Sequence, residues 1–259
     1  MKEIILLDGT THTQEELIDQ MYVDSFYYDY LKQAAMSSSM LSKLKRSVKE
    51  YVYSLRYSEP RSQALIDGGL FHTMILEPEK LKHYVFLDVE SKNTKAYKEA
   101  AEHHSEVFTK KEKRESERLV DAIFRCEQAK SLLINADYEV PMIDYIQGMP
   151  FRGKADVLRK DGTIIDLKTS LDIHTFHISA RKYGYNRQAY IYCTLFGVPY
   201  DKFKFLVIDK KSLDIGIFDC SEEFFEYGKQ DTHEIIDKYH QTVGNPNFEL
   251  DDYILRATL

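Results

Sequence analysis

The spacing of apolar residues predicts helices in the first third of the chain. Within residues 12–56, apolar side chains recur at the three- and four-residue intervals of a helix, at Leu41, Leu44, Val48 and Tyr51. Thr13 and the run Ser37–Ser39 are suitable helix caps. Residues 61–78 repeat the helical spacing up to Pro78, which cannot continue a helix. We therefore expect both segments to be helical.

In the centre of the chain, apolar and polar residues alternate with the period of two that is typical of strands. Strands are predicted at 138–146, 151–159 and 163–168, with turns at 148–150 and 160–162. The following pattern predicts helices at 174–182, 185–197 and 221–240 and strands at 202–209 and 213–219. Residues 91–117 are highly charged, and an exposed helix or mobile loop is expected there, before a helix near 116–135. This order predicts an α/β fold with a central mixed β-sheet flanked by helices.

The length of 259 residues suits one large domain. We expect a single domain over 1–259, with a helical N-terminal portion at 1–60, a core at 61–240 and a tail at 241–259. No apolar run is long enough for a membrane span, and the apolar stretch at the N-terminus is too short for a signal peptide. A cytoplasmic protein without membrane partners is therefore expected.

Charge and cysteine content narrow the classes of protein. The net charge of −7 argues against a general nucleic-acid coat, although an acidic exterior can coexist with a local basic groove. The three cysteines, Cys126, Cys193 and Cys220, are far apart in the sequence, so neither a disulfide framework nor a CxxC zinc site is indicated.

The hairpin predicted over 151–168 carries the most informative residues. A three-residue loop that ends in Gly162 favours a type I turn followed by a left-handed residue. In that register Arg159 faces Thr163, and Asp156 faces Asp166. Alternation then puts Lys154, Asp156, Asp166 and Lys168 on one face of the hairpin. A two-residue loop would instead put the two aspartates on opposite faces.

Two close carboxylates beside a lysine indicate a divalent-metal site. Close like charges are unfavourable unless one is protonated or a cation bridges them, and Mg²⁺ prefers oxygen ligands. A neighbouring ammonium can orient a water molecule and neutralise charge that develops on a phosphate. The alternative is a solvated hairpin with a surface Asp–Lys pair. The apolar neighbours Ile164, Ile165 and Leu167 argue for a buried strand.

Three further elements accompany the hairpin in sequence order. His72 lies in the segment Gly68-Gly-Leu-Phe-His-Thr, Glu139 opens the first predicted strand, and Gln188 and Tyr192 lie one helical turn apart. This ordered set resembles the PD-(D/E)XK nuclease superfamily and, within it, the RecE/exonuclease VIII-like and RecB-type branch. The resemblance covers roughly residues 35–230. The segment 207–214 departs from the Glu-x-x-Pro-Pro pattern of RecE-like proteins.

The resemblance implies a role for each matching residue. The metal ligands would be His72, Asp156, Asp166 and the backbone carbonyl of Leu167. The catalytic set would be Lys168, Asp156, Asp166, Gln188, Tyr192 and Glu139, with Gln188 and Tyr192 bracing the site. DNA contacts are expected from Arg181, Lys182, Tyr185, Arg187 and Gln188.

The resemblance also implies an activity, cofactors and partners. The metal would be Mg²⁺, with Mn²⁺ as a substitute; an Fe–S cluster is not expected, because it needs four clustered cysteines. The expected activity is a phage or prophage 5′→3′ exodeoxyribonuclease that acts on linear double-stranded DNA ends and leaves 3′ single-stranded overhangs. A RecT-like annealing protein and a ring-shaped homo-oligomer, trimer or tetramer, are implied partners. A PD-(D/E)XK endonuclease and a catalytically silent DNA-binding protein remain alternatives.

Overall fold

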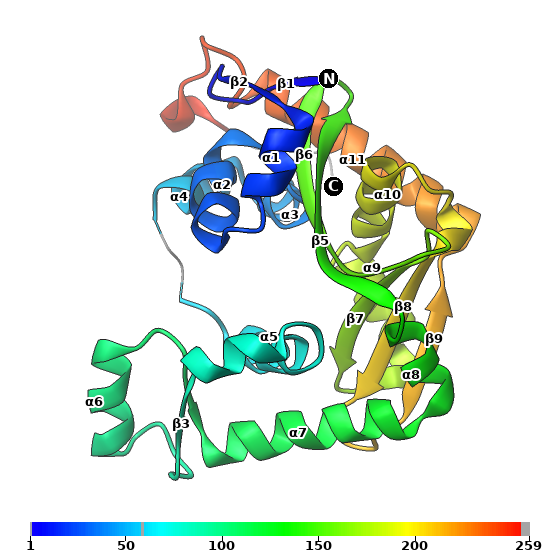
Figure 1. The fold of residues 1–259 in the computed structure, drawn as a ribbon. Helices are drawn as coiled ribbons and strands as arrows, with labels where there is room; N and C mark the ends of the chain where they lie inside the picture. The colour runs from blue at the N-terminus through cyan, green and yellow to red at the C-terminus, as the bar shows by residue number, and fades with distance from the viewer. Residues whose placement is uncertain (1, 58–59, 255–259) are drawn as a thin grey trace.

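The computed structural model describes residues 2–57 and 60–254, and a five-stranded mixed sheet lies at its centre (Figure 1). The strands follow one another in chain order: β5 (Ala136–Ile146), β6 (Met149–Arg159), β7 (Ile164–Ser170), β8 (Phe203–Asp209) and β9 (Ile215–Asp219). Neighbours are antiparallel except β7 and β8, which are parallel and are connected through α9 (Phe176–Lys182) and α10 (Tyr185–Phe196). The predicted mixed sheet flanked by helices is confirmed.

The strands β6 and β7 separate after a short shared stretch. Their ladder holds only two pairs, Val157 with Ile165 and Leu158 with Ile164. Beyond this point β5 and β6 continue as a long two-stranded ribbon toward the N-terminal part of the chain (Figure 1). There Met36 pairs with β6, through hydrogen bonds from its N–H to the Pro150 carbonyl at 2.9 Å and from the Arg152 N–H to its own carbonyl at 2.8 Å. The fork between β6 and β7 is where the candidate site forms.

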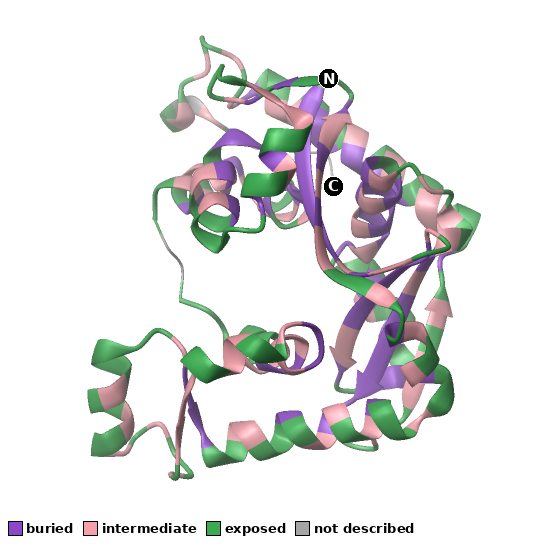
Figure 2. Cartoon of the chain, viewed as in Figure 1, coloured by how far each residue is buried: buried purple, intermediate pink, exposed green. Residues whose placement is uncertain are grey.

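Helices cover both faces of the sheet, so β6, β7 and β8 are mostly buried, whereas the edge strand β9 is partly exposed (Figure 2). On one face α5 (Gln63–Leu76), α7 (Lys110–Arg125) and α8 (Glu127–Leu133) pack through Phe71, Ile123 and Leu133 onto Ile165 and Leu167. On the other face α9 and α10 pack onto a core that includes Ala155, Ile164, Phe203 and Phe205. The burial of alternate residues on opposite faces explains the near-continuous apolar sequence of β7 and β8.

A third layer of helices closes the N-terminal end of the ribbon. Helices α3 (Ser38–Arg46) and α4 (Val48–Arg56) bury Leu41, Leu44, Val48 and Tyr51 against α10 and α11 (Glu222–Gln241). Before them come β1 (Glu3–Ile5), β2 (Thr11–Thr13), α1 (Gln14–Gln20), a π-helical turn (Phe26–Tyr30) and α2 (Leu31–Ala34). The helical spacing predicted within 12–56 therefore corresponds to several short helices, which Ser37 and Ser47 divide by capping α3 and α4.

The segment between α5 and α7 holds two short strands that the pattern did not predict, and a helix inside the charged range 91–117, where an exposed helix or mobile loop was expected. The strands β3 (Val85–Leu87) and β4 (Val107–Thr109) form a small parallel sheet, with α6 (Lys95–His103) between them. The 3₁₀ turns are Pro78–His83, Ile173–Thr175, Tyr200–Lys202 and Leu250–Asp252. Over the described ranges, none of the helices has both the length and the apolar character required to cross a membrane.

Candidate active site

The turn of the β6–β7 hairpin has the predicted geometry. The Arg159 N–H donates to the Thr163 carbonyl at 2.9 Å, and Gly162 adopts a positive φ of +81°. The three-residue loop and the register that it sets are therefore confirmed. In this register Asp156 lies across from Asp166.

Three carboxylates occupy one row across the forked strands. The β5–β6 ladder lacks one position, at Glu139 and Asp156, which its register places opposite each other. The β6–β7 ladder ends at Val157 and Ile165, one position before Asp156 would face Asp166. The sheet thus opens where Glu139, Asp156 and Asp166 stand side by side.

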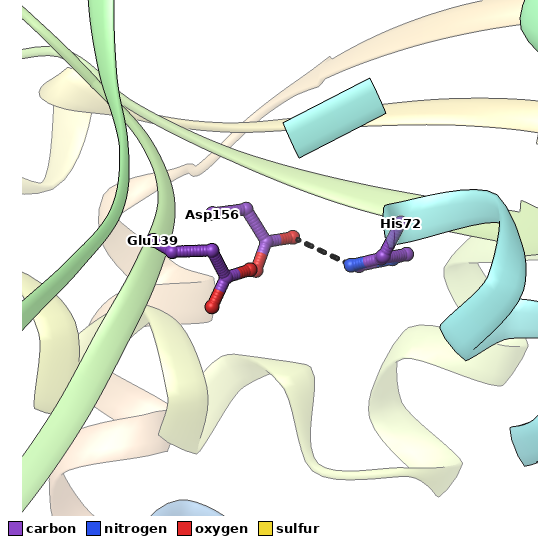
Figure 3. A group of neighbouring side chains, drawn as sticks. All are labelled: His72, Glu139 and Asp156. Atoms are coloured by element: carbon purple, nitrogen blue, oxygen red, sulfur yellow. Dashed lines mark ion pairs between the residues drawn. The ribbon is translucent and has the colours of Figure 1, made fainter. Parts of the chain in front are cut away.

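Glu139 has a left-handed backbone, with a φ of +49°. This conformation costs about 1–2 kcal/mol for a residue with a Cβ. Its carboxylate lies with Asp156 and His72 in a group whose ligand atoms are all within 4.8 Å of one another (Figure 3). Strained backbone that places a polar side chain in a cluster of this kind is typical of functional sites.

His72 reaches the row from the last turns of α5. Its Nδ1 lies 3.5 Å from Asp156 Oδ2, and its side chain is 28% exposed. Burial lowers the pKa of His72 to about 4, and the positive charge of Lys168 contributes to this shift. The negative charge of Asp166 and the Leu167 backbone act in the opposite direction. The imidazole is therefore neutral at physiological pH, which is the form that binds a metal ion.

The two carboxylates of the group are held in surroundings that disfavour their negative charge. Burial raises the pKa of Glu139 to about 8, and the charges of Asp156 and Glu77 add to the effect. Burial also raises the pKa of Asp156, although Lys168 and the Leu167 N–H, 2.8 Å from Asp156 Oδ2, act against it. A bound cation would relieve this repulsion. One imidazole and two carboxylates therefore fit a divalent ion such as Mg²⁺ or Mn²⁺.

Asp166 and Lys168 form a buried pair beside this group. Asp166 is fully buried; its Oδ1 accepts a hydrogen bond from Gln188 Nε2 at 2.5 Å, and its Oδ2 pairs with the Lys168 ammonium. Burial raises the pKa of Asp166 to about 6, with Lys168 opposing the shift. Burial acts to lower the pKa of Lys168, but Asp166 and Asp156 outweigh it and raise that pKa. Lys168 is accordingly a permanent positive charge at the site.

Helix α10 supports this pair from the other side. Tyr192 lies one turn after Gln188 on α10, and it packs against Gly153 of β6. A Cβ at Gly153 would lie 2.8 Å from the Tyr192 ring, so only glycine permits this approach. The predicted catalytic and bracing roles of Tyr192 stay predictions.

The candidate ligands thus fall into two groups. The structure joins Glu139, predicted as a catalytic residue, to the metal group of His72 and Asp156, and the backbone of Leu167 contacts both of these. Both oxygens of Asp166, predicted as a metal ligand, are engaged by Gln188 and Lys168. The left-handed backbone that brings Glu139 into the group has no signal in the sequence.

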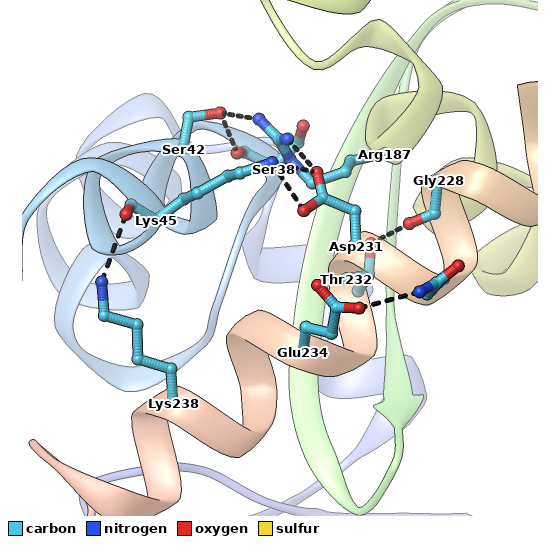
Figure 4. A network of polar contacts seen from close by, with 10 residues as sticks. Ser38, Ser42, Lys45, Arg187, Gly228, Asp231, Thr232, Glu234 and Lys238 are labelled. Carbon is cyan, nitrogen blue, oxygen red and sulfur yellow. Dashed lines mark hydrogen bonds and ion pairs between the residues drawn. The ribbon is translucent and has the colours of Figure 1, made fainter. Parts of the chain in front are cut away.

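The residues predicted to bind DNA have different surroundings. Arg181 and Lys182 are exposed on α9, and the ring of Tyr185 lies 4.8 Å from the Lys168 ammonium. Arg187, in contrast, is 5% exposed. Its guanidinium pairs with Asp231 of α11 and donates to Ser42 Oγ of α3 at 2.9 Å (Figure 4).

The structure gives Arg187 a buried position, so its DNA contact stays a prediction that this burial does not favour. Gln188 points to the site, and the preceding position on a helix is turned by about 100° from it. That rotation directs Arg187 into the junction of α3, α10 and α11 instead. Asp231 also forms an ion pair with the Lys45 ammonium, at 2.6 Å. This junction is therefore a network of paired charges rather than a surface for phosphates.

Comparisons with known proteins agree with this geometry. The family described as PDDEXK-like domain of unknown function (DUF3799) matches residues 37–247. A crystal structure of a "Putative exonuclease" from Eubacterium rectale is similar with a TM-score of 0.65 and 16% identity, over 92% of this chain and 95% of that chain. The crystal structure of SSO0001 has a TM-score of only 0.33 at 15% identity, over 80% of this chain and 88% of that chain. The search of curated proteins found no match. Because the family match spans most of the sequence, the chain belongs to this PDDEXK-like family, and so to the PD-(D/E)XK nuclease superfamily.

Proposed function

We propose that the protein is a metal-dependent deoxyribonuclease that hydrolyses phosphodiester bonds at the fork of β6 and β7. The observation that carries the proposal is the group of His72, Glu139 and Asp156 beside the buried Asp166–Lys168 pair. It combines a cation site with a fixed positive charge, which are the two features that phosphoryl chemistry needs most.

The chain's own residues would share the work as follows. His72, Glu139 and Asp156 would hold Mg²⁺ or Mn²⁺, which supplies positive charge that makes the phosphorus more electrophilic. The Lys168 ammonium would neutralise charge on the phosphate oxygens. Gln188 would fix Asp166, and through it the position of Lys168, and Tyr192 would brace this part of α10 against β6.

Within this class, we propose an exonuclease that acts on the ends of linear double-stranded DNA in the 5′→3′ direction. The order of the sequence elements and the name that the similar Eubacterium rectale protein carries support an exonuclease. The 3′ single-stranded overhangs would pass to a RecT-like annealing protein of a phage or prophage recombination system. A ring-shaped trimer or tetramer would keep the enzyme on its substrate, and a monomer in size-exclusion chromatography with light scattering would contradict the ring.

A digestion assay with Mg²⁺ tests the activity and its polarity together. Linear duplex labelled at the 5′ or the 3′ end is compared with covalently closed circular DNA. We expect early release of the 5′ label and an intact circle; cleavage of the circle would indicate an endonuclease instead. Absence of cleavage, together with no Mn²⁺ binding by calorimetry, would indicate a silent DNA-binding protein.

The variant Asp166→Ala should abolish cleavage in the same assay while the protein stays folded. The exposed Asp137 of β5 provides the matched control, and Asp137→Ala should keep full activity. Normal cleavage by pure Asp166→Ala would refute the assignment of the site.

A further inference from the structure

Lys154 is a second buried lysine near the site that the proposed mechanism does not use. It lies on β6 two residues before Asp156, hence on the same face of that strand and roughly 7 Å along it. Its side chain is 7% exposed. Its ammonium lies 4.7 Å from the ring centre of Tyr27 and 5.5 Å from that of Tyr28.

The positive charge of Lys154 is incompletely neutralised. The nearest carboxylate oxygen recorded in the described part of the chain is Asp24 Oδ1, at 3.8 Å, beyond hydrogen-bonding distance. Asp24 is half-exposed, and its other oxygen already accepts a hydrogen bond from Lys80 at 2.8 Å. A buried lysine is rarely left without a close anion, and cation–π contacts offset only about 2 kcal/mol of the desolvation.

A purely structural role for Lys154 is already filled by its neighbour. The Arg152 guanidinium lies 4.4 Å from the ring centre of Tyr27, and its Nε donates to the Leu31 carbonyl at 3.1 Å. The Arg152 side chain and the Met36 bridge therefore tie the N-terminal helices to β6 without Lys154. Lys154 is therefore left with a positive charge that no anion within hydrogen-bonding distance in the described part of the chain neutralises.

We propose that Lys154, held against the adjoining rings of Tyr27 and Tyr28, is a second phosphate-binding position that takes the backbone phosphate next to the scissile one. The inference rests on the proposed nuclease function. The tyrosine rings fix the ammonium in place before substrate arrives, so a phosphate meets a preorganised cation. Lys154 sets which phosphate of the strand lies over the metal group, whereas Lys168 acts on the scissile phosphate itself.

The salt dependence of DNA binding tests this position. A fluorescent duplex is titrated with the wild type, Lys154→Met and the control Lys160→Met, which changes an exposed lysine of the hairpin turn. Ca²⁺ replaces Mg²⁺ to suppress cleavage, and anisotropy is measured at several salt concentrations. We expect Lys154→Met to weaken binding about tenfold and to reduce the slope of log K against log salt by about 1, with no such change in the control.

The unfolding stability of the same variants separates binding from structure. Methionine preserves the packing against the rings and removes the buried charge, so a functional Lys154 predicts equal or higher stability for Lys154→Met. An unchanged salt slope, or lower stability with normal binding, would overturn the inference. If Lys154→Met does not fold, Lys154→Gln is titrated instead, and the same reduction in the slope of log K against log salt is expected. If the wild type does not bind DNA at all, the proposed nuclease function itself is refuted.

Discussion

Among the site residues, Glu139 is the one whose charge depends most on whether a metal ion is bound. Its backbone is left-handed, its carboxyl is surrounded by Asp156 and Glu77, and burial raises its pKa to about 8. Such a carboxyl is held in its neutral form unless a cation binds. The same surroundings that favour a metal ion must therefore destabilise the metal-free protein once Glu139 ionises.

The variant Glu139→Gln should stabilise the metal-free protein at alkaline pH. The folded pKa of Glu139 lies above its unfolded value of about 4.5, so its contribution to stability is full below pH 4.5 and is lost as pH rises to about 8. In EDTA at pH 8.5, urea denaturation should show Glu139→Gln more stable than the wild type by about 1–2 kcal/mol, and the gap should shrink at pH 5. The exposed Asp137→Asn should show no such pH-dependent gap. A variant that is less stable at pH 8.5 would contradict the buried carboxyl.

At the scale of elements, two adjacent residues of α10 make contacts in different places, one at the candidate active site and one at the junction with α3 and α11. Gln188 faces Asp166 in the sheet, while Arg187 faces Asp231 of α11. Gly228 lets α11 approach closely, because a Cβ there would lie 2.1 Å from the Asn186 carbonyl oxygen. The position of the site thus depends on how α10 is held by α3 and α11.

Removal of the Arg187 side chain should destabilise the fold. Arg187→Ala leaves Asp231 with one partner, Lys45, in a buried position. The loss should be about 3 kcal/mol of unfolding free energy in urea. Arg181→Ala, on exposed α9, should change stability by less than about 0.5 kcal/mol. Weakened DNA binding by Arg187→Ala at unchanged stability would instead support a DNA contact for Arg187.

Elements with strong local patterns were predictable, and the short ones were not. The predicted strands of the central sheet agree with β5 to β9 within about two residues, because alternation and turn residues mark them. Strands β3 and β4 have three residues each, too few for a period to appear. Their pairing depends on a long-range contact between segments that are separated by α6.

At the scale of the whole molecule, the candidate metal group joins two separate parts of the chain. His72 comes from α5, whereas Glu139 and Asp156 come from the sheet. Phe71 and Ile75 hold α5 against α7 and the sheet. A metal ion would therefore add a cross-link between the helical layer and the sheet.

Binding of Mn²⁺ should raise the thermal stability of the protein. At a metal concentration a hundred times the dissociation constant, the gain is about 2.7 kcal/mol, or roughly 5 °C or more for a chain of this size. His72→Ala should remove most of this shift, and the exposed His174→Ala should retain it. Differential scanning fluorimetry at pH 8 measures the effect. An equal shift in His72→Ala would place the metal elsewhere.

The sequence alone determined the local features of this protein. Alternation and helical spacing defined the sheet and its main helices, the Lys160–Gly162 loop set the register of Asp156 and Asp166, and the ordered motifs indicated the superfamily. Each of these depends on residues that are neighbours in the chain, or on their order.

The tertiary structure decided what depends on distant residues. It brought His72 to Glu139 and Asp156, turned Arg187 into a buried network, and placed the Lys154 ammonium against two tyrosines of the N-terminal region. The physical reason is that the burial and the charged neighbours of a side chain depend on which segments pack together. The period of apolar residues along the sequence does not indicate a packing partner that is many residues away.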